Sequence, residues 1–392
     1  MILKRLNSAL KTLSNSKIVF QSPKKNKLLI FDDTSLDDLE HVLKDMSYFV
    51  LETRIERIKK IYLNFKVIFL TIKNFKGNLL SAYLMSLIEI VNPKIVFTFI
   101  DNSYKFSYFA RLKHKKYHFV ALQNGARYEQ NTLKYLKEKK IYTMKYYKFF
   151  IPTFLCFGEN EIDDYKKNKI QVNKFIKVGS LRVSNFEHEA KKKKLLIKKP
   201  IYDICLISDV FAWDDIANIE NIRVKEGIVK LWKFLIKYSK ENKKKFILAT
   251  RQRKKTFKIE KDFFKKHLTK EEFNFISKRL YYRKEKFKTY KLLCQSKLLV
   301  ATLSTTLREN IYLKNKVLAC NFSNTKLHDF PLKGICALKD CNYKTFKKRI
   351  SKVLSISKKN YLSKIKNRFY AIENNKISTV DNVRNQLESF LK

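Results

Sequence analysis

Three hydroxyl side chains stand together where a predicted strand gives way to a predicted helix. The apolar run Lys297–Ala301 has the length of a buried strand, and a helical pattern starts soon after it. The N–H groups and the positive dipole end of a helix N-terminus bind phosphate, and hydroxyl groups add donors. The segment therefore predicts a phosphate site on Ser304, Thr305 and Thr306, with Glu309 as an acceptor for a ribose or sugar hydroxyl.

The same segment also has a purely structural explanation. Thr306 and Glu309 have the spacing of a capping box, in which a hydroxyl and a carboxylate satisfy backbone N–H groups at a helix start. A cap does not require three consecutive hydroxyls, so the two roles are compatible.

Polar residues follow two other predicted strands of the second half of the chain. Ser208 and Asp209 end the first of these strands. Arg251 and Arg253 follow the second strand, where a guanidinium can neutralise a diphosphate. In a chain this rich in lysine, a basic run by itself is weak support for a site.

In the first half, a carboxylate comes directly after a predicted buried strand. Asp101 follows the β-branched and aromatic run Lys94–Ile100, and Asn102 and Ser103 come next. A carboxylate at the C-terminal end of a strand is well placed to act as a general base. The alternative is that Asp101 or Asn102 caps the following helix.

A second polar group follows the next predicted strand, His118–Leu122. The pair Asn124–Gly125 is a turn signal, which alone explains those two residues. If the two strands are neighbours, however, further polar side chains gather near Asp101 and favour a binding site. They are Gln123, Arg127 and Glu129.

Short apolar runs alternate with longer amphipathic stretches along the chain, which is the pattern of βα units around a parallel sheet. In open α/β sheets, ligands bind beyond the carboxyl ends of the strands, where the residues above are found. The predicted strands are Leu28–Phe31, Lys94–Ile100, His118–Leu122, Phe154–Phe157, Phe175–Val178, Tyr202–Ser208, Phe246–Thr250, Lys297–Ala301 and Lys316–Cys320. The predicted helices are Ser81–Val91, Ile228–Tyr238, Leu303–Leu313 and the segment from Tyr343 to the end.

A charged segment that ends in proline divides the pattern. Glu189–Pro200 predicts an interdomain linker, and the alternative is a solvated helix end. We therefore predict an N-terminal domain over 1–189, a linker over 190–200 and a C-terminal domain over 201–392. The C-terminal helices, including Val383–Leu391, are expected to pack back toward the first domain.

The chain of 392 residues is strongly basic, with 85 Lys and Arg against 36 Asp and Glu, a formal charge of +49. Lys, Asn, Ile, Phe and Tyr are abundant together, as AT-rich codons produce, and the basic residues run throughout the chain. A solvated lysine-rich surface is the preferred interpretation over a nucleic-acid groove. A basic surface held against an anionic membrane also fits.

Several classes of protein are disfavoured by what the sequence lacks. Its six cysteines form no CxxC pair, and its six histidines show no paired-ligand spacing, so no metal site is expected. The start Met1–Arg5 lacks the apolar core of a signal peptide. The apolar runs Val67–Ile72 and Ile95–Ile100 have only strand length, far from the ~20 residues of a membrane span. We expect a cytoplasmic protein, with the inner face of the membrane as its place of peripheral contact.

The order of these segments resembles a known family. VFTFIDNS, ALQNGARYE, FLCFGENE and KVGSLRVS, followed by the linker and then by IYDICLIS and LLVATLSTTLREN, resemble the bacterial surface carbohydrate biosynthesis proteins. These look like GT-B glycosyltransferases and are distantly similar to capsule-polysaccharide and CDP-glycerol polymer transferases. The resemblance covers roughly Leu28–Lys392. It implies two Rossmann-like α/β domains that face a cleft.

The resemblance also implies roles. It places a nucleotide-sugar donor on the C-terminal domain, at Ser304, Thr305, Thr306 and Glu309, and an acceptor on the N-terminal side, at Asp101, Gln123 and Asn124. It implies transfer of a sugar to a surface polysaccharide, lipopolysaccharide or capsule precursor, free or lipid-linked, with no metal or other cofactor.

The sequence departs from the family at one position. Related polymer transferases often carry His before the glycine of this turn, where this chain has Asn124. Asp101 is therefore the preferred base and Glu129 its substitute. The alternative function is a non-catalytic basic α/β protein that binds nucleic acid or anionic lipid.

Overall fold

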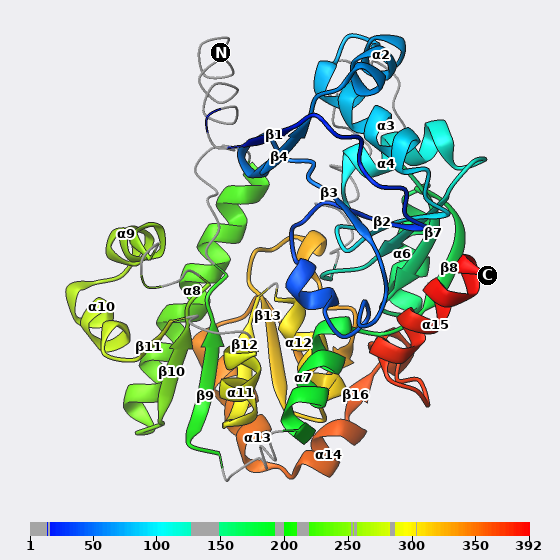
Figure 1. The fold of residues 1–392 in the computed structure, drawn as a ribbon. Coiled ribbons are helices and arrows are strands. Elements are labelled where there is room, and N and C mark those ends of the chain that lie inside the picture. The colour runs from blue at the N-terminus through cyan, green and yellow to red at the C-terminus, as the bar shows by residue number, and fades with distance from the viewer. Residues whose placement is uncertain are drawn as a thin grey trace. The chain divides into compact units, whose positions relative to one another are not determined.

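The computed structural model describes residue 14 and residues 16–126, 149–192, 200–209, 219–251, 254, 257–282, 287–302 and 304–392. The chain divides into two compact units (Figure 1). Unit 1 takes residues 1–125, 132–185 and 373–392, and unit 2 takes residues 126–131 and 186–372.

Unit 1 is built on a six-stranded parallel sheet in the order β3-β2-β5-β6-β7-β8. Its central strands are continuous apolar runs because both faces of the sheet are covered. The strands are β2 (Leu28–Phe31), β3 (Phe49–Leu51), β5 (Ile95–Thr98), β6 (His118–Leu122), β7 (Phe150–Cys156) and β8 (Gln171–Lys177). A separate parallel pair joins β1 (Lys17–Val19) to β4 (Lys60–Tyr62).

Alternate side chains of each central strand enter different cores of unit 1. Leu29 and Phe31 pack among the apolar side chains of α3 (Leu79–Val91), α4 (Tyr104–Lys113) and α6 (Glu159–Lys167). On the other face, Leu28 packs with Leu181, Val383 and Leu387. The helices of that face are the short η1 (Leu36–Leu39), α7 (Leu181–Lys192), which continues into unit 2, and the C-terminal α15 (Thr379–Leu391). Also in unit 1 are η2 (Ile55–Arg57) and α2 (Phe65–Lys73).

Unit 2 repeats the architecture with a six-stranded parallel sheet in the order β11-β10-β9-β12-β13-β15. Its strands are β9 (Tyr202–Ile207), β10 (Phe246–Ala249), β11 (Leu280–Tyr281), β12 (Ser296–Ala301), β13 (Val317–Asn321) and β15 (Ala337–Lys339). Its α-helices are α8 (Ile219–Glu241), α9 (Lys258–His267), α10 (Lys270–Ser277), α11 (Lys288–Cys294), α12 (Thr305–Tyr312), α13 (Tyr343–Ser355) and α14 (Lys358–Ser363). The smaller elements are η5 (Lys326–His328), η6 (Arg368–Tyr370) and the antiparallel pair β14 (Lys333–Gly334) and β16 (Ile365–Lys366).

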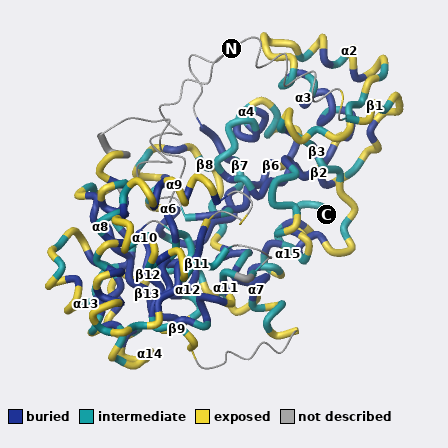
Figure 2. The backbone as a smooth tube through the Cα atoms, turned by 90° about the vertical axis from the view of Figure 1, so that its left-hand side faces the viewer, coloured by how far each residue is buried: buried dark blue, intermediate teal, exposed yellow. Residues whose placement is uncertain are grey.

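The predicted α/β class with two Rossmann-like domains is confirmed. Figure 2 shows the central strands of both sheets mostly in the buried colour, while many helices alternate between buried and exposed positions. Every predicted strand is present, with bounds that differ by a few residues. No described helix is both long and apolar enough to cross a membrane.

The apolar run Val67–Ile72, to which no element was assigned, lies in helix α2. Two predictions of local structure are corrected. Glu189–Lys192, the start of the predicted linker, forms the last turn of α7, and residues 193–199 lie outside the described residues. The segment from Tyr343 to the end is not helical throughout, because β16 and an irregular stretch separate α14 from α15.

Helix α8 approaches the end of β13 very closely. A Cβ atom added to Gly227 would lie 2.7 Å from the backbone carbon of Phe322 and 2.7 Å from the nitrogen of Ser323. Such contacts are closer than any side chain tolerates, so glycine is what permits this packing.

Candidate functional site

Asp101 joins the loops that follow two neighbouring strands of unit 1. Its side chain is fully buried, and Oδ1 accepts a hydrogen bond from the backbone N–H of Asn124 at 3.1 Å. Because β5 and β6 pair in parallel, both loops leave the sheet at the same edge. The alternative, that Asp101 or Asn102 caps the next helix, is wrong. The N-cap of α4 is Ser103, whose Oγ accepts from the N–H of Phe106 at 3.3 Å.

Gln123 links the loop that follows β6 to the end of the neighbouring strand β7. The side chain is fully buried, its Nε2 donates to the carbonyl of Gly125 at 2.9 Å, and its Oε1 accepts from the N–H of Phe157 at 2.7 Å. The structure thus brings Asp101, Gln123, Asn124 and Gly125 together, as predicted. It does so through bonds to backbone groups.

A charged pair that the sequence did not point to supports this loop from α7 and η1. Arg182 donates from Nη1 to the carbonyl of Asn124 at 2.9 Å and from Nε to Oδ2 of Asp38 at 3.0 Å. Its guanidinium carbon lies 5.4 Å from the ring centroid of Phe99. The glycine-containing strand end just before Arg182 was the available signal. Arg127 and Glu129 lie outside the described residues.

The corresponding edge of unit 2 holds two buried hydroxyl groups. Ser208 follows β9, Thr302 follows β12, and these strands are neighbours. Among the residues that the structure describes, neither Ser208 Oγ nor Thr302 Oγ1 has a hydrogen-bond partner. Leaving such a group buried and unbonded costs about 1–3 kcal/mol, so the pair marks a place where a ligand or water completes the bonding. Beside them, Oδ2 of Asp209 accepts from the N–H of Thr302 at 2.7 Å.

The start of α12 differs from the predicted capping box. The N-cap is Ser304, whose Oγ accepts from the N–H of Thr306 at 3.3 Å and lies 2.6 Å from Thr306 Oγ1. Thr305 Oγ1 accepts from the N–H of Ala126, also of unit 2, at 2.9 Å. Because the helix starts at Thr305, Glu309 lies too far along it to bond back to the cap.

Glu309 is buried and held from a neighbouring helix. Its Oε2 accepts a hydrogen bond from the hydroxyl of Tyr290, in α11, at 2.8 Å. No pattern in the sequence singled out Tyr290. Arg251 is exposed just beyond β10, and its backbone N–H donates to Oε1 of Glu260 at 3.1 Å. Arg253 lies outside the described residues.

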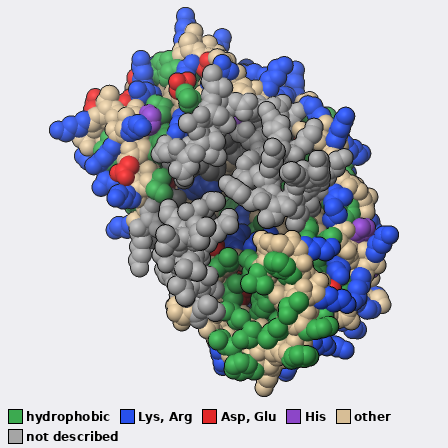
Figure 3. All heavy atoms as spheres, turned by 90° about the horizontal axis from the view of Figure 1, so that it is seen from above, with side chains coloured by type: hydrophobic (Ala, Val, Ile, Leu, Met, Phe, Trp, Pro, Cys, Tyr) green, Lys and Arg blue, Asp and Glu red, His purple; other side chains and the backbone are tan. Residues whose placement is uncertain are grey.

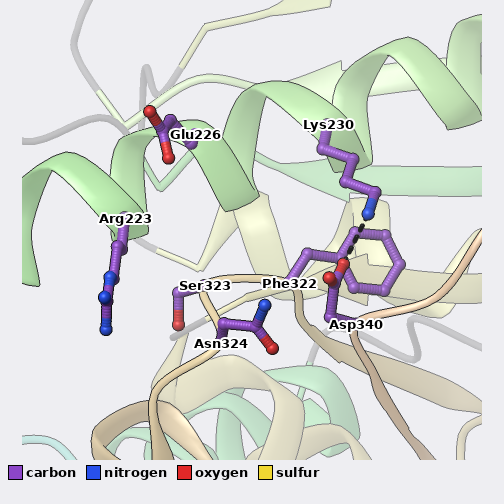
Figure 4. A pocket seen from close by; sticks show the side chains of 7 residues that line it. All are labelled: Arg223, Glu226, Lys230, Phe322, Ser323, Asn324 and Asp340. Carbon is purple, nitrogen blue, oxygen red and sulfur yellow. Dashed lines mark hydrogen bonds and ion pairs between the residues drawn. The ribbon is translucent and has the colours of Figure 1, made fainter.

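A cavity of about 540 Å³ continues this edge of unit 2 beyond β13 and β15 (Figure 4). Arg223, Glu226 and Lys230 of α8 line it from one side. The loop after β13 and the end of β15 line it from the other side, through Phe322, Ser323, Asn324 and Asp340. Lys230 Nζ donates to Oδ1 of Asp340 at 2.6 Å.

Among the residues that the structure describes, none that was predicted to belong to the site lines the cavity. The polar residues that follow strand Lys316–Cys320 were the missed signal, because the rule about strand ends applies to them too. Within the described residues, no group of three or more His, Cys, Asp and Glu side chains could hold a metal ion.

Solved structures share this arrangement over nearly the whole chain. The UDP-GlcNAc 2-epimerase of Methanocaldococcus jannaschii, in complex with UDP-GlcNAc and UDP, is 12% identical with a TM-score of 0.52, covering 92% of this chain and 99% of its own. The UDP-GlcNAc 2-epimerase of Neisseria meningitidis, bound to UDP-GlcNAc, is 12% identical with a TM-score of 0.52, covering 93% and 98%. A variant of the wall teichoic acid polymerase TagF soaked with CDPG is 11% identical with a TM-score of 0.50, covering 100% and 94%.

No protein-family model and no curated protein matches the chain by sequence. At these identities the structural similarities establish the fold, which is of the GT-B type.

Proposed function

We propose that this protein is a GT-B glycosyltransferase that moves a sugar from a nucleotide-sugar donor to a surface polysaccharide, lipopolysaccharide or capsule precursor, without a metal ion. The observation that carries the proposal is the polar edge of unit 2. There the buried hydroxyls of Ser208 and Thr302 stand at the ends of β9 and β12, and β12 leads into the hydroxyl-rich start of α12. Proteins of the same fold have been solved with UDP-GlcNAc and with CDPG.

The donor phosphates are assigned to the N-terminus of α12. Its backbone N–H groups and the hydroxyls of Ser304, Thr305 and Thr306 are donors to phosphate oxygens. Ser208, Arg251 and Arg253 follow the neighbouring strands β9 and β10 and supply a further hydroxyl and positive charge. Glu309 is assigned to a ribose or sugar hydroxyl, and its bond from Tyr290 fixes its orientation.

The cavity beside α8 has a place in this arrangement. Strands β12, β13 and β15 are consecutive neighbours, so the cavity begins about 5–10 Å from the end of β12. That is within the length of a nucleotide. We therefore assign the nucleoside part of the donor to the cavity lined by Arg223, Ser323 and Asn324.

Transfer requires a base on the acceptor side. The acceptor oxygen forms a bond to the anomeric carbon of the sugar as the bond from that carbon to the phosphate oxygen breaks. Asp101 is assigned to take the hydroxyl proton, with Glu129 as the substitute, and Asn102 and Ser103 orient it. The departing nucleotide carries negative charge, which the α12 dipole and the arginines stabilise. The acceptor is assigned to the loop formed by Gln123, Asn124, Gly125 and Arg127.

A thermal-shift comparison of UMP, UDP, GDP, CMP and CDP tests the donor assignment. A ligand that binds only the folded protein raises the melting temperature, by an amount that grows with the logarithm of its concentration above Kd, so one of these nucleotides should stabilise the protein at millimolar concentration. The absence of any shift with nucleotides and nucleotide sugars would contradict the proposal. Stabilisation by oligonucleotides alone would favour the nucleic-acid-binding alternative.

A further inference from the structure

Helix α2 is attached to unit 1 through one narrow face. Val67 and Thr71, one turn apart, are the buried residues of the helix. Asn74, which caps its C-terminal end, donates from Nδ2 to Glu89 Oε2 at 3.0 Å, and Thr71 Oγ1 lies 3.4 Å from Ser86 Oγ of α3. This face packs α2 on α3 and leaves the opposite face open.

The open face of α2 is apolar. Phe65 is 85% exposed, Ile68 44%, Phe69 57% and Ile72 71%. Their spacing of three and four residues makes a continuous stripe of the kind that a helix in a globular protein turns toward its core. The rings of Phe65 and Phe69 stack with centroids 6.5 Å apart. Here the stripe faces outward.

Exposed apolar residues continue on both sides of the helix. We define the α2 patch as Leu63, Phe65, Ile68, Phe69, Ile72, Phe75 and Leu79, all of which are exposed. Figure 3 looks down on the side where α2 lies in Figure 1 and shows hydrophobic side chains gathered over one region of that face. A contiguous exposed apolar surface of this kind marks an interaction site.

The charged residues in the sequence segment that holds the α2 patch are all basic. From Arg57 to Ile88 the sequence contains five lysines and one arginine but no Asp or Glu. Three of these lysines, Lys66, Lys73 and Lys76, are exposed in α2 and just after it. An apolar helix face flanked by lysines fits a negatively charged surface with an apolar interior. A second copy of the chain would instead bring like charges together.

We propose that the α2 patch docks unit 1 on an anionic lipid bilayer. Helix α2 lies in the plane of the interface, with Phe65, Phe69 and Ile72 among the acyl chains. Lys66, Lys73 and Lys76 contact the phosphate headgroups. This inference rests on the surface of unit 1 alone and holds whether or not the protein transfers sugars.

Co-sedimentation of the full-length protein with lipid vesicles tests the proposal. We expect binding to vesicles of phosphatidylglycerol and phosphatidylcholine, and much weaker binding to phosphatidylcholine alone. The double variant Phe69→Ser/Ile72→Ser should reduce the partition coefficient on the order of tenfold or more, because it removes two inserted apolar side chains. Lys66→Gln/Lys73→Gln/Lys76→Gln should reduce binding to anionic vesicles on the order of a hundredfold at low salt. Added salt should weaken the binding of the wild-type protein to anionic vesicles.

Matched controls separate the effect of the α2 patch from that of the overall charge and hydrophobicity of the protein. Phe369→Ser removes an exposed phenylalanine of unit 2, and Lys344→Gln/Lys348→Gln/Lys352→Gln removes three exposed lysines of α13. Both controls should bind as the wild type does, and unchanged melting temperatures should show that all variants are folded. Failure of the wild type to bind anionic vesicles, or equal losses in patch and control variants, would overturn the proposal. A wild-type dimer that the patch variants convert to a monomer, without vesicle binding, would assign the patch to a second copy.

Discussion

At position 101 a carboxylate accepts a hydrogen bond from the backbone of Asn124, and an amide oxygen in its place can accept the same bond. We therefore predict that Asp101→Asn leaves folding and nucleotide binding nearly unchanged. It should lower the transfer rate about 10²–10⁴-fold, because an amide cannot take the acceptor proton. Steady-state kinetics and a thermal melt measure the two effects separately.

Asp101→Ala is the companion variant, since it removes both the base and the bond that holds the loop. Near-normal turnover in Asp101→Asn, with loss in Asp101→Ala, would reassign the carboxylate to positioning the loop. That outcome would also leave Glu129 as the base to test.

Ser304 combines two roles that can be separated. Its hydroxyl caps α12 in this structure and is proposed to contact phosphate. Glycine at an N-cap costs only a few tenths of a kcal/mol, whereas losing a hydrogen bond to a charged phosphate costs about 1.5–3 kcal/mol. Ser304→Gly should therefore weaken nucleotide binding roughly tenfold or more by calorimetry, with little loss of stability. Unchanged affinity would leave Ser304 as a cap alone.

Glu309 has a comparable test at residue scale. Glu309→Ala should weaken nucleotide binding by about 1.5–3 kcal/mol if the carboxylate accepts from the ligand. Tyr290→Phe removes the bond to Oε2 while keeping the carboxylate, so it should have a smaller effect. Equal affinity in the folded wild-type and Glu309→Ala proteins would make Glu309 a purely structural partner of Tyr290.

At the scale of elements, the buried strands could be predicted and the short ones could not. Strands such as β5 and β6 are covered on both faces, so they read as apolar runs. Strands β3, β11 and β15 have three residues or fewer, which is too short to show a period. Helix α2 was not predicted, because a short apolar run does not distinguish a strand from a helix. Its apolar residues on both faces produced that run.

The candidate site shows the same division. That Asp101 and Asn124 lie near each other follows from two adjacent strands, which a parallel βα pattern predicts. The contacts from Arg182 and Asp38 come from elements far away in the sequence, and no local pattern encodes them. The capping box failed because α12 starts at Thr305, within the error of one or two residues that is normal for a helix end.

The close approach of α8 to β13 makes Gly227 a test of the packing between elements. In Gly227→Ala the added methyl would overlap backbone atoms of Phe322 and Ser323, which cannot move as a side chain can. We expect a loss of about 1–3 kcal/mol of stability despite the better helix propensity of alanine. Lys233→Ala, at an exposed position of the same helix, is the control. A melting temperature of Gly227→Ala that matches the control would show that α8 can shift.

At the scale of the whole molecule, each unit has its own core, so stability can be probed unit by unit. Val383 and Leu387 of α15 are fully buried in unit 1. Leu387→Ala should destabilise unit 1 by about 2–5 kcal/mol. Both tryptophans of the chain, Trp213 and Trp232, belong to the range of unit 2. For Leu387→Ala, circular dichroism should therefore show an unfolding transition at a lower urea concentration than in the wild type. The transition followed by tryptophan fluorescence should stay near its wild-type position. Equal shifts of both signals would mean that the units unfold as one.

His328 makes the stability of unit 2 depend on pH. Burial lowers the pKa of this histidine to about 4, whereas in an unfolded chain it is near 6.5. Between these values the unfolded chain binds a proton that the folded chain does not, so stability falls as the pH falls. The full loss, reached near pH 4, is about 3 kcal/mol. His328→Gln should show a correspondingly flatter dependence of unfolding free energy on pH between 7 and 5, measured by tryptophan fluorescence in urea. A slope equal to that of the wild type would show that His328 does not cause the pH dependence of stability.

The return of the chain to unit 1 has a consequence for how the protein is made. Unit 2 is drawn mostly from the continuous range 186–372, whereas the core of unit 1 is closed by Val383 and Leu387. On the ribosome, the strands of unit 1 emerge first and must wait while all of unit 2 is synthesised before α15 can cover them. Unit 2 can thus fold during translation, and unit 1 finishes only after it. During that interval this face of the sheet lacks α15. The side chains of Leu28 and Ile95, which pack with Val383 and Leu387 in the finished core, are then open to chaperone binding or aggregation.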